Sequence, residues 1–225
     1  AAAKGHSDAA CDLGFIYEQG LNGIVSRERA EHFYALGVNL GNPRAMNNLA
    51  GLLLTALGAA GEGARAFELY SQSAAAGYEK GITNLGVCYL RGVHVPADLI
   101  NARSLFERAA ALKETEAMFY TAYFAMKEAI LAGNEQGLQG AFKTLQEVAE
   151  LNPQHSDAHF YLAYFLENGL VVERNLSGAL THLARAVSAK PDNVKALKKM
   201  GQLLVDVGEE EKGHELIKKA NELSA

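Results

Sequence analysis

The stretch that decides the fold is GITNLGVCYLRGVHVPAD, residues 81–98. It opens with a small residue, has Leu-Gly four positions later, and has an aromatic residue three positions after that glycine. A small residue returns in the same frame along the chain, the first four times at intervals of 36, at Ala9, Ala45, Gly81, Ala117, Ala158 and Ala196. Repeats of this length are helical hairpins, which stack because one hairpin cannot bury its apolar face alone. The pattern predicts an all-α, right-handed α-α superhelix of about six helix-turn-helix repeats.

A second series of small residues marks the second helix of each hairpin. Ala102 is followed four residues later by Phe106, and the same pairing recurs as Ala30 with Tyr34 and Ala66 with Tyr70. The first helices are predicted at 7–19, 43–56, 79–91, 114–131, 155–168 and 193–207, and the second at 27–39, 62–76, 99–111, 135–151, 176–189 and 209–224. Small residues at 9, 14, 50, 86, 122, 163 and 201 are expected to let the two helices of a hairpin approach closely, with the rings filling the space opposite.

Residues 1–225 are therefore interpreted as one repeat domain, in which residues 1–5 resemble the tail of a preceding repeat. The repeats span about 6–41, 42–77, 78–113, 114–153, 154–191 and 192–225.

Residues that end or cap helices lie between the two helices of several hairpins. Glycines that can close a helix in the left-handed conformation are Gly20, Gly92, Gly169 and Gly208. Short polar side chains able to cap the next helix are Ser26, Asp98 and Asn175. Glu62 takes this place in the second repeat, where the start of the second helix is expected to be less well defined.

Composition excludes several classes of function. The net charge is −5, and the 21 basic residues are dispersed, which argues against nucleic acid as the main partner. Apolar runs fall far short of the ~18 residues of a membrane span. Cys11 and Cys88 lie two hairpins apart, too far for a disulfide, and are interpreted as packing residues. Residues 58–63 are rich in glycine but lack the Lys-Ser/Thr ending of a phosphate-binding loop.

Candidate chemistry is sparse in this sequence. His155 and His159 have a spacing that suits a metal pair, but no third ligand except Asp157 is nearby, and His159 is interpreted as solvated. No grouping of nucleophile, base and orienting residue can be assembled. We therefore expect no catalytic site, no metal and no cofactor.

The repeats resemble the Sel-like repeat, a relative of the tetratricopeptide repeat. The third repeat carries the resemblance through Gly81, Leu85-Gly86, Tyr89, Gly92, residues 95–98 (VPAD) and Ala102. The C-terminal third is similar to the ordinary tetratricopeptide form, with Pro153 and Pro191 placed where that pattern ends its second helix. Repeat four departs most, and longer helices with a local change of curvature are expected there.

The resemblance implies a concave groove lined by the first helices. Groove-facing positions lie five and two before, and two, five and six after, the leucine of the Leu-Gly pair. Carried over, this gives Arg44, Asn47, Lys80, Arg91, Phe119, Tyr123, Lys127, Phe160, Tyr164, Asn168, Lys195 and Lys198. The pairs Phe119 with Tyr123 and Phe160 with Tyr164 would form an aromatic floor, or else pack between helices.

The resemblance further implies a non-catalytic adaptor or scaffold that binds a peptide or domain of another protein. Two alternatives stay open: an accessory domain that binds a small molecule or glycan, and a structural spacer or self-association module, including a homo-oligomer. Neither nucleic acid nor a membrane span is expected. The alanine-rich first half has a bacterial character, which favours the periplasm or cytoplasm.

Overall fold

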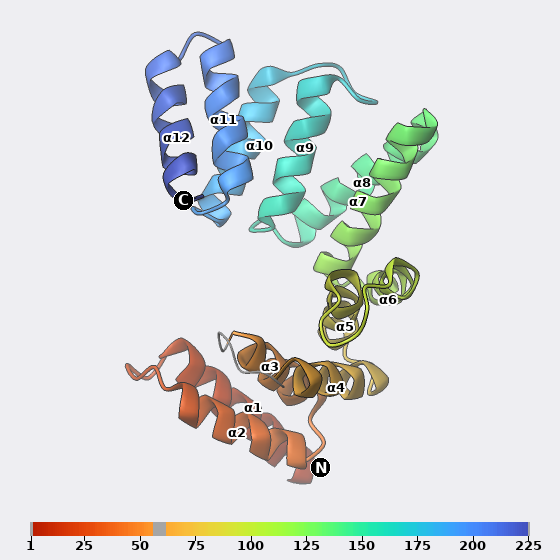
Figure 1. Ribbon diagram of the computed structural model, residues 1–225, viewed down its shortest axis with the longest axis vertical. Coiled ribbons are helices and arrows are strands. Elements are labelled where there is room, and N and C mark those ends of the chain that lie inside the picture. The colour runs from red at the N-terminus through yellow and green to blue at the C-terminus, as the bar shows by residue number, and fades with distance from the viewer. Residues whose placement is uncertain (1, 56–61, 225) are drawn as a thin grey trace. The chain divides into compact units, whose positions relative to one another are not determined.

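The computed structural model describes residues 2–55 and 62–224, and within these ranges the secondary structure consists of twelve helices and no strand (Figure 1). The helices are α1 (Ala2–Gln19), α2 (Arg27–Asn39), α3 (Pro43–Leu54), α4 (Glu62–Ala75), α5 (Glu79–Arg91), α6 (Leu99–Ala111), α7 (Thr115–Ala132), α8 (Glu135–Leu151), α9 (Ser156–Asn168), α10 (Leu176–Ala189), α11 (Val194–Asp206) and α12 (Glu210–Glu222). The predicted all-α solenoid is confirmed. The glycine-rich segment at 58–61 and the residues just before Glu62 lie outside the described residues.

Two compact units make up the chain, Ala1–Ala117 and Met118–Ala225. Within the first unit, α1 packs on α2, α3 on α4, and α5 on α6, and within the second α9 packs on α10 and α11 on α12. Each hairpin also contacts the next one in its unit, through α2 with α3, α4 with α5, and α10 with α11. Among the described helices, none is long and apolar enough to cross a membrane.

The glycine of the Leu-Gly pair sets the distance between the two helices of a hairpin. A Cβ added to Gly86 would lie 2.8 Å from the Phe106 ring, and one added to Gly14 would overlap the ring of Tyr34. Both rings are fully buried, with 0% exposure. The predicted match between small residue and opposing ring is therefore confirmed, and the second-helix rings belong to the core.

The first small residue of the second and third repeats lies between two hairpins. Ala45 contacts Gly37 of the preceding hairpin, and Gly81 lies against Ser73 of the hairpin before it. These residues therefore set the spacing between hairpins, whereas Ala9, the equivalent residue of the first repeat, was expected to act within one hairpin. Ala9 is exposed, because the described residues supply no hairpin on that side.

The predicted caps and helix ends are confirmed. The side chains of Ser26, Asp98 and Asn175 accept hydrogen bonds from the backbone amides of Arg29, Asn101 and Gly178. The four helix-closing glycines all have positive φ, Gly20 (68°), Gly92 (71°), Gly169 (64°) and Gly208 (91°). Repeat four has the longer helices expected of it, since α7 has 18 residues and α8 has 17, against 13 each in α5 and α6.

The residue before a first helix also ties neighbouring hairpins together. Asn42 caps α3 through Ala45 N and donates from Nδ2 to Asp8 Oδ1 (2.7 Å). Asn193 caps α11 and donates from Nδ2 to Ser156 Oγ (2.8 Å). Glu114 does the same before α7, because its Oε2 accepts from Ala117 N (2.8 Å) and from Thr83 Oγ1 (2.7 Å). Each of these buried side chains thus joins two consecutive first helices.

Candidate functional site

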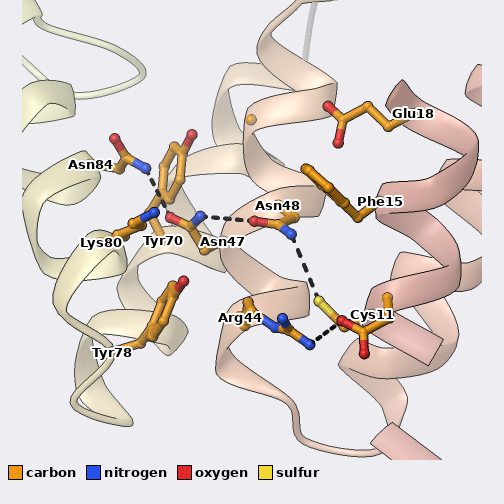
Figure 2. Close-up of a pocket in the computed structure, with 12 residues that line it drawn as sticks. Cys11, Phe15, Glu18, Arg44, Asn47, Asn48, Tyr70, Tyr78, Lys80 and Asn84 are labelled. Atoms are coloured by element: carbon orange, nitrogen blue, oxygen red, sulfur yellow. Dashed lines mark hydrogen bonds and ion pairs between the residues drawn. The ribbon is translucent and has the colours of Figure 1, made fainter. Parts of the chain in front are cut away.

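The first helices of the first unit enclose a cavity of about 370 Å³, which we call the polar cleft (Figure 2). Helices α1, α3 and α5 supply most of its walls, and the α4 side chain of Tyr70 closes its floor. The lining residues are Cys11, Asp12, Phe15, Glu18, Arg44, Asn47, Asn48, Gly51, Tyr70, Tyr78, Lys80 and Asn84. The cleft has room beside Gly51, where an added Cβ would meet only the Tyr70 hydroxyl, at 3.5 Å.

A chain of side-chain amides crosses the cleft from α5 to α1. Asn84 Nδ2 donates to Asn47 Oδ1 (2.8 Å), and Asn47 Nδ2 donates to Asn48 Oδ1 (3.1 Å). Asn48 Nδ2 then donates to Cys11 Sγ (3.7 Å), as the dashed lines in Figure 2 show. A primary amide has two N–H donors and an oxygen with two lone pairs, so these contacts leave hydrogen-bonding capacity in each asparagine. We call Asn47, Asn48 and Asn84 the amide ladder.

Charged groups lie on both sides of the amide ladder. Arg44 Nη2 is 2.6 Å from Asp12 Oδ1, so the two charges neutralise each other. Glu18 Oε2 accepts from the hydroxyl of Tyr34 (2.6 Å), which holds this carboxylate at the α1 side. Lys80 is exposed at the α5 side, and no acidic group in the described part of the chain pairs with it.

The thiol and the phenol groups in the cleft are held in their neutral forms. Burial raises the pKa of the Cys11 thiol, and this effect outweighs the lowering influence of Arg44. Burial also raises the pKa of Tyr70 and of Tyr78. A protonated thiol is a poor nucleophile. The cleft therefore offers amides, hydroxyls and fixed charges, a set suited to recognition by hydrogen bonds and ion pairs.

Three of the residues expected in the groove meet in this cleft, namely Arg44, Asn47 and Lys80. Arg91 lies in the last turn of α5, at the opposite end of that helix from Lys80. The sequence pattern did not predict Asn48 and Asn84, which directly precede the leucine of their repeats. Nor were Cys11, Phe15 and Glu18 predicted, although the same offsets applied to Leu13 yield all three.

The aromatic residues of the second unit form a packed cluster. Phe119 is only 6% exposed and stacks on Tyr123, with their ring centroids 6.1 Å apart. Tyr161, which the sequence analysis did not select, contacts Phe119 (5.8 Å) and Tyr123 (5.3 Å). Phe160 meets Tyr161 edge-on and packs against the core of α9, α10 and α11. The Lys127 ammonium lies 5.4 Å from the centroid of Tyr123.

The other expected contact residues of the second unit lie on α9 and α11. Tyr164 is half-buried, and its backbone carbonyl accepts from Asn168 Nδ2 (2.8 Å). Lys195 and Lys198 are exposed on α11. The adjacent Lys199 is paired instead, with Glu167 Oε1 at 2.9 Å.

The structure corrects the interpretation of His159 as a solvated residue. His159 is 1% exposed, and its Nδ1 lies 3.0 Å from His182 Nδ1. Its Nε2 lies 3.1 Å from the carbonyl oxygen of Pro153. His155 does not share this arrangement, because its Nδ1 accepts from Ala158 N and caps α9. Within residues 2–55 and 62–224, no three acidic, His or Cys side chains are grouped to hold a metal ion.

Comparison with solved structures shows the same fold in bacterial proteins. A Sel1 repeat protein from Oxalobacter formigenes superposes with a TM-score of 0.74 at 19% identity, over 95% of this chain and 84% of that one. The protective antigen c5321 of uropathogenic Escherichia coli, which displays an SLR fold, gives a TM-score of 0.69 at 25% identity. That comparison covers 98% of this chain but 46% of c5321. No curated protein sequence matches the chain.

The repeat pattern itself identifies the family. The Sel1 repeat matches at residues 7–42, 43–78, 80–114 and 156–191, which is more than half of the chain. Proteins built from these tetratricopeptide-like repeats are generally protein-interaction scaffolds, and the family is typically non-catalytic. The hairpins of the first and third matched repeats, with a Leu-Gly pair facing an aromatic residue, show the structural form of that repeat. The chain belongs to the Sel1 repeat family.

Proposed function

We propose that the chain is a non-catalytic interaction module that holds a segment of a partner protein in the polar cleft. The observation that carries this proposal is the cleft's lining. Two consecutive first helices, α3 and α5, present the amide ladder and the unpaired Lys80 to one cavity of about 370 Å³, and α1 forms its other wall. Polar groups with unused hydrogen-bonding capacity, set in a concave surface, are what a bound backbone requires.

The lining also favours a polypeptide over the two alternatives. A site for a small molecule or glycan gains affinity when several titratable groups converge on the ligand. In this cleft Arg44 and Asp12 are paired with each other instead. A structural spacer does not require a cavity lined by amides with unused hydrogen-bonding capacity. The amide ladder provides such a lining over two neighbouring hairpins. A polypeptide that crosses the first helices could use every one of these groups.

We further propose a second contact surface on the other unit. It consists of the half-buried Tyr123 and Tyr164 with Lys127, Lys195 and Lys198, which are exposed. Aromatic and cationic side chains are common anchors in protein interfaces. Phe119 and Phe160 would support this surface from beneath through their packing.

Filling the cleft tests the proposal. Gly51 occupies the position that Phe15 holds one repeat earlier, 36 residues before it, so Gly51→Phe suits the repeat and projects a ring into the cavity. Peptides selected from a random display library on the wild-type chain should bind the Gly51→Phe variant at least tenfold more weakly in fluorescence anisotropy. Circular dichroism would check that the helical content is unchanged.

A matched control is available at Gly140 on α8, where an added Cβ meets nothing within 4 Å. Gly140→Phe makes the same chemical change outside the cleft and should leave the affinity at the wild-type value. Equal binding to wild type and to both variants would move the interface away from the polar cleft and refute the proposal.

A further inference from the structure

Resting on the proposed function of the polar cleft, we infer that its occupant is an extended peptide with two opposite charges. An acidic side chain lies over α5, a basic side chain lies over α1, and about six to eight residues separate them. The cleft distinguishes peptides by this charge pattern, and the residues between the two charges are bound mainly through their backbone.

The α5 side of the cleft is cationic. Lys80 is exposed there without an acidic partner in the described part of the chain. Arg44 of α3 also lines the cleft, but its guanidinium is neutralised by Asp12 of α1 at 2.6 Å. Lys80 is therefore the unbalanced charge on this side, and a carboxylate of the peptide would complement it.

The α1 side has the opposite character. Phe15 is 46% exposed, and Glu18 lies three residues later on the same helix, so the ring and the carboxylate share one face. Figure 2 shows these two side chains across the cleft from Lys80. A Lys or Arg side chain could lie on the ring and pair with the carboxylate. The bond from Tyr34 to Glu18 Oε2 leaves the other oxygen for that pairing.

Between these two ends, the cleft offers amides and no further unpaired charge. Asn84, Asn47 and Asn48 each retain an N–H donor or a lone pair after their contacts with one another. Peptide N–H and C=O groups match such amides whatever the side chains are. The middle of the occupant is thus bound without strong preference for its sequence, and discrimination lies at the two charged ends.

The spacing of the two charges follows from helix geometry. Adjacent packed helices are about 8–10 Å apart, so α1 and α5 are separated by about 16–20 Å. Glu18 lies five residues after the leucine of its repeat and Lys80 five before, which adds about 15 Å along the helix axis. The diagonal of about 22–25 Å corresponds to about six to eight residues of extended chain.

Synthetic peptides test this inference directly. Fluorescein-labelled, end-capped peptides of Ser, Thr and Gln would carry one Arg and one Glu, either seven positions apart in both orders or adjacent. One order of the spaced pair should bind the wild-type chain at least threefold more tightly than the adjacent pair of identical composition. Exposed ion pairs are individually weak, so an effect of this size is expected from the two pairs together.

Substitutions that change the charged side chains of the protein provide a second test. Lys80→Glu should transfer the preference to a peptide in which Arg replaces the Glu, while Lys143→Glu, an exposed change on α8 outside the cleft, should leave the wild-type preference intact. Glu18→Gln keeps the acceptor for Tyr34 and should weaken binding of the Arg-containing end about two- to fivefold.

Failure of this inference is distinguishable from failure of the proposed function. Peptides that bind equally whatever their charges, yet lose affinity with Gly51→Phe, would overturn the charge pattern and leave the cleft as the interface. Peptides that do not bind at all would also overturn the inference, and the library-selected peptides would then decide the proposed function separately.

Discussion

At the scale of single residues, His182 and His159 share one hydrogen bond whose direction can be deduced. The carbonyl of Pro153 can only accept, so His159 Nε2 carries a proton and, in the neutral ring, His159 Nδ1 is the acceptor. His182 Nδ1 must then donate across the 3.0 Å contact. Burial, the neighbouring His159 and Arg185 lower the pKa of His182 to about 4. The two histidines line a small cavity formed by α8, α9 and α10, and Glu150 of α8 is the acidic residue in its lining.

This pair predicts a loss of stability in acid. The pKa of His182 is lower in the folded protein than in the unfolded chain, so the unfolded chain binds more protons as the pH falls from about 6.5 toward 4. We expect the free energy of unfolding to fall by about 1–2 kcal/mol across this range, less than the full shift implies because His182 is partly solvated. Urea unfolding at pH 7.5, 6 and 5 would measure it.

The control for the acid effect is His182→Asn, which keeps a donor for His159 and should flatten the pH dependence. His32→Asn, at an exposed site on α2, should not flatten it. An identical pH profile for wild type and His182→Asn would show that other groups cause the acid sensitivity.

At the scale of helices, capping side chains decide where each element begins. Asn175 accepts from Gly178 N (2.8 Å) at the start of α10, so Asn175→Ala removes a partner of the first free amides. The variant should lose about 1 kcal/mol of stability in urea unfolding, and Asn175→Asp should retain most of it. A loss of equal size in both variants would show that the cap bond is not the cause.

The sequence predicts elements of this kind well because their causes are local. The caps at Ser26 and Asn175 and the closing glycines each act within a few residues of the backbone that they order, and the small residues recur at the spacing of the repeat. The candidate site was predicted only in part. Asn47 could be predicted from its position in the repeat, but the bond that it accepts from Asn84 depends on how two hairpins meet. His159 was misread for the same reason, since its partner lies 23 residues away.

At the scale of the whole molecule, a stacked array transmits damage only to neighbouring hairpins. Gly201 and Gly213 bring α11 and α12 into backbone contact, and a Cβ at Gly201 would lie 2.7 Å from the Gly213 carbonyl oxygen. Gly201→Ala should destabilise this hairpin by about 1–3 kcal/mol. Hydrogen–deuterium exchange should show lost protection in α11 and α12 and unchanged protection in α2 to α5.

The neighbouring substitution Gln202→Ala, at an exposed position of α11, is the matched control and should leave protection intact. A loss of protection spread evenly from α2 to α12 after Gly201→Ala would instead indicate that the chain unfolds as one cooperative body.

The bonds that tie one first helix to the next make the order of the hairpins part of the information in the chain. Asn42 is matched to Asp8, Glu114 to Thr83, and Asn193 to Ser156. A gene in which two hairpins are exchanged would preserve the 36-residue spacing, but these buried side chains would lose their hydrogen-bond partners. Each mismatched junction should lower the free energy of unfolding by about 1–3 kcal/mol. These three hairpins are thus specific for the hairpin that precedes them, and duplication or recombination of repeats in this lineage would require the partners of each such junction to move together.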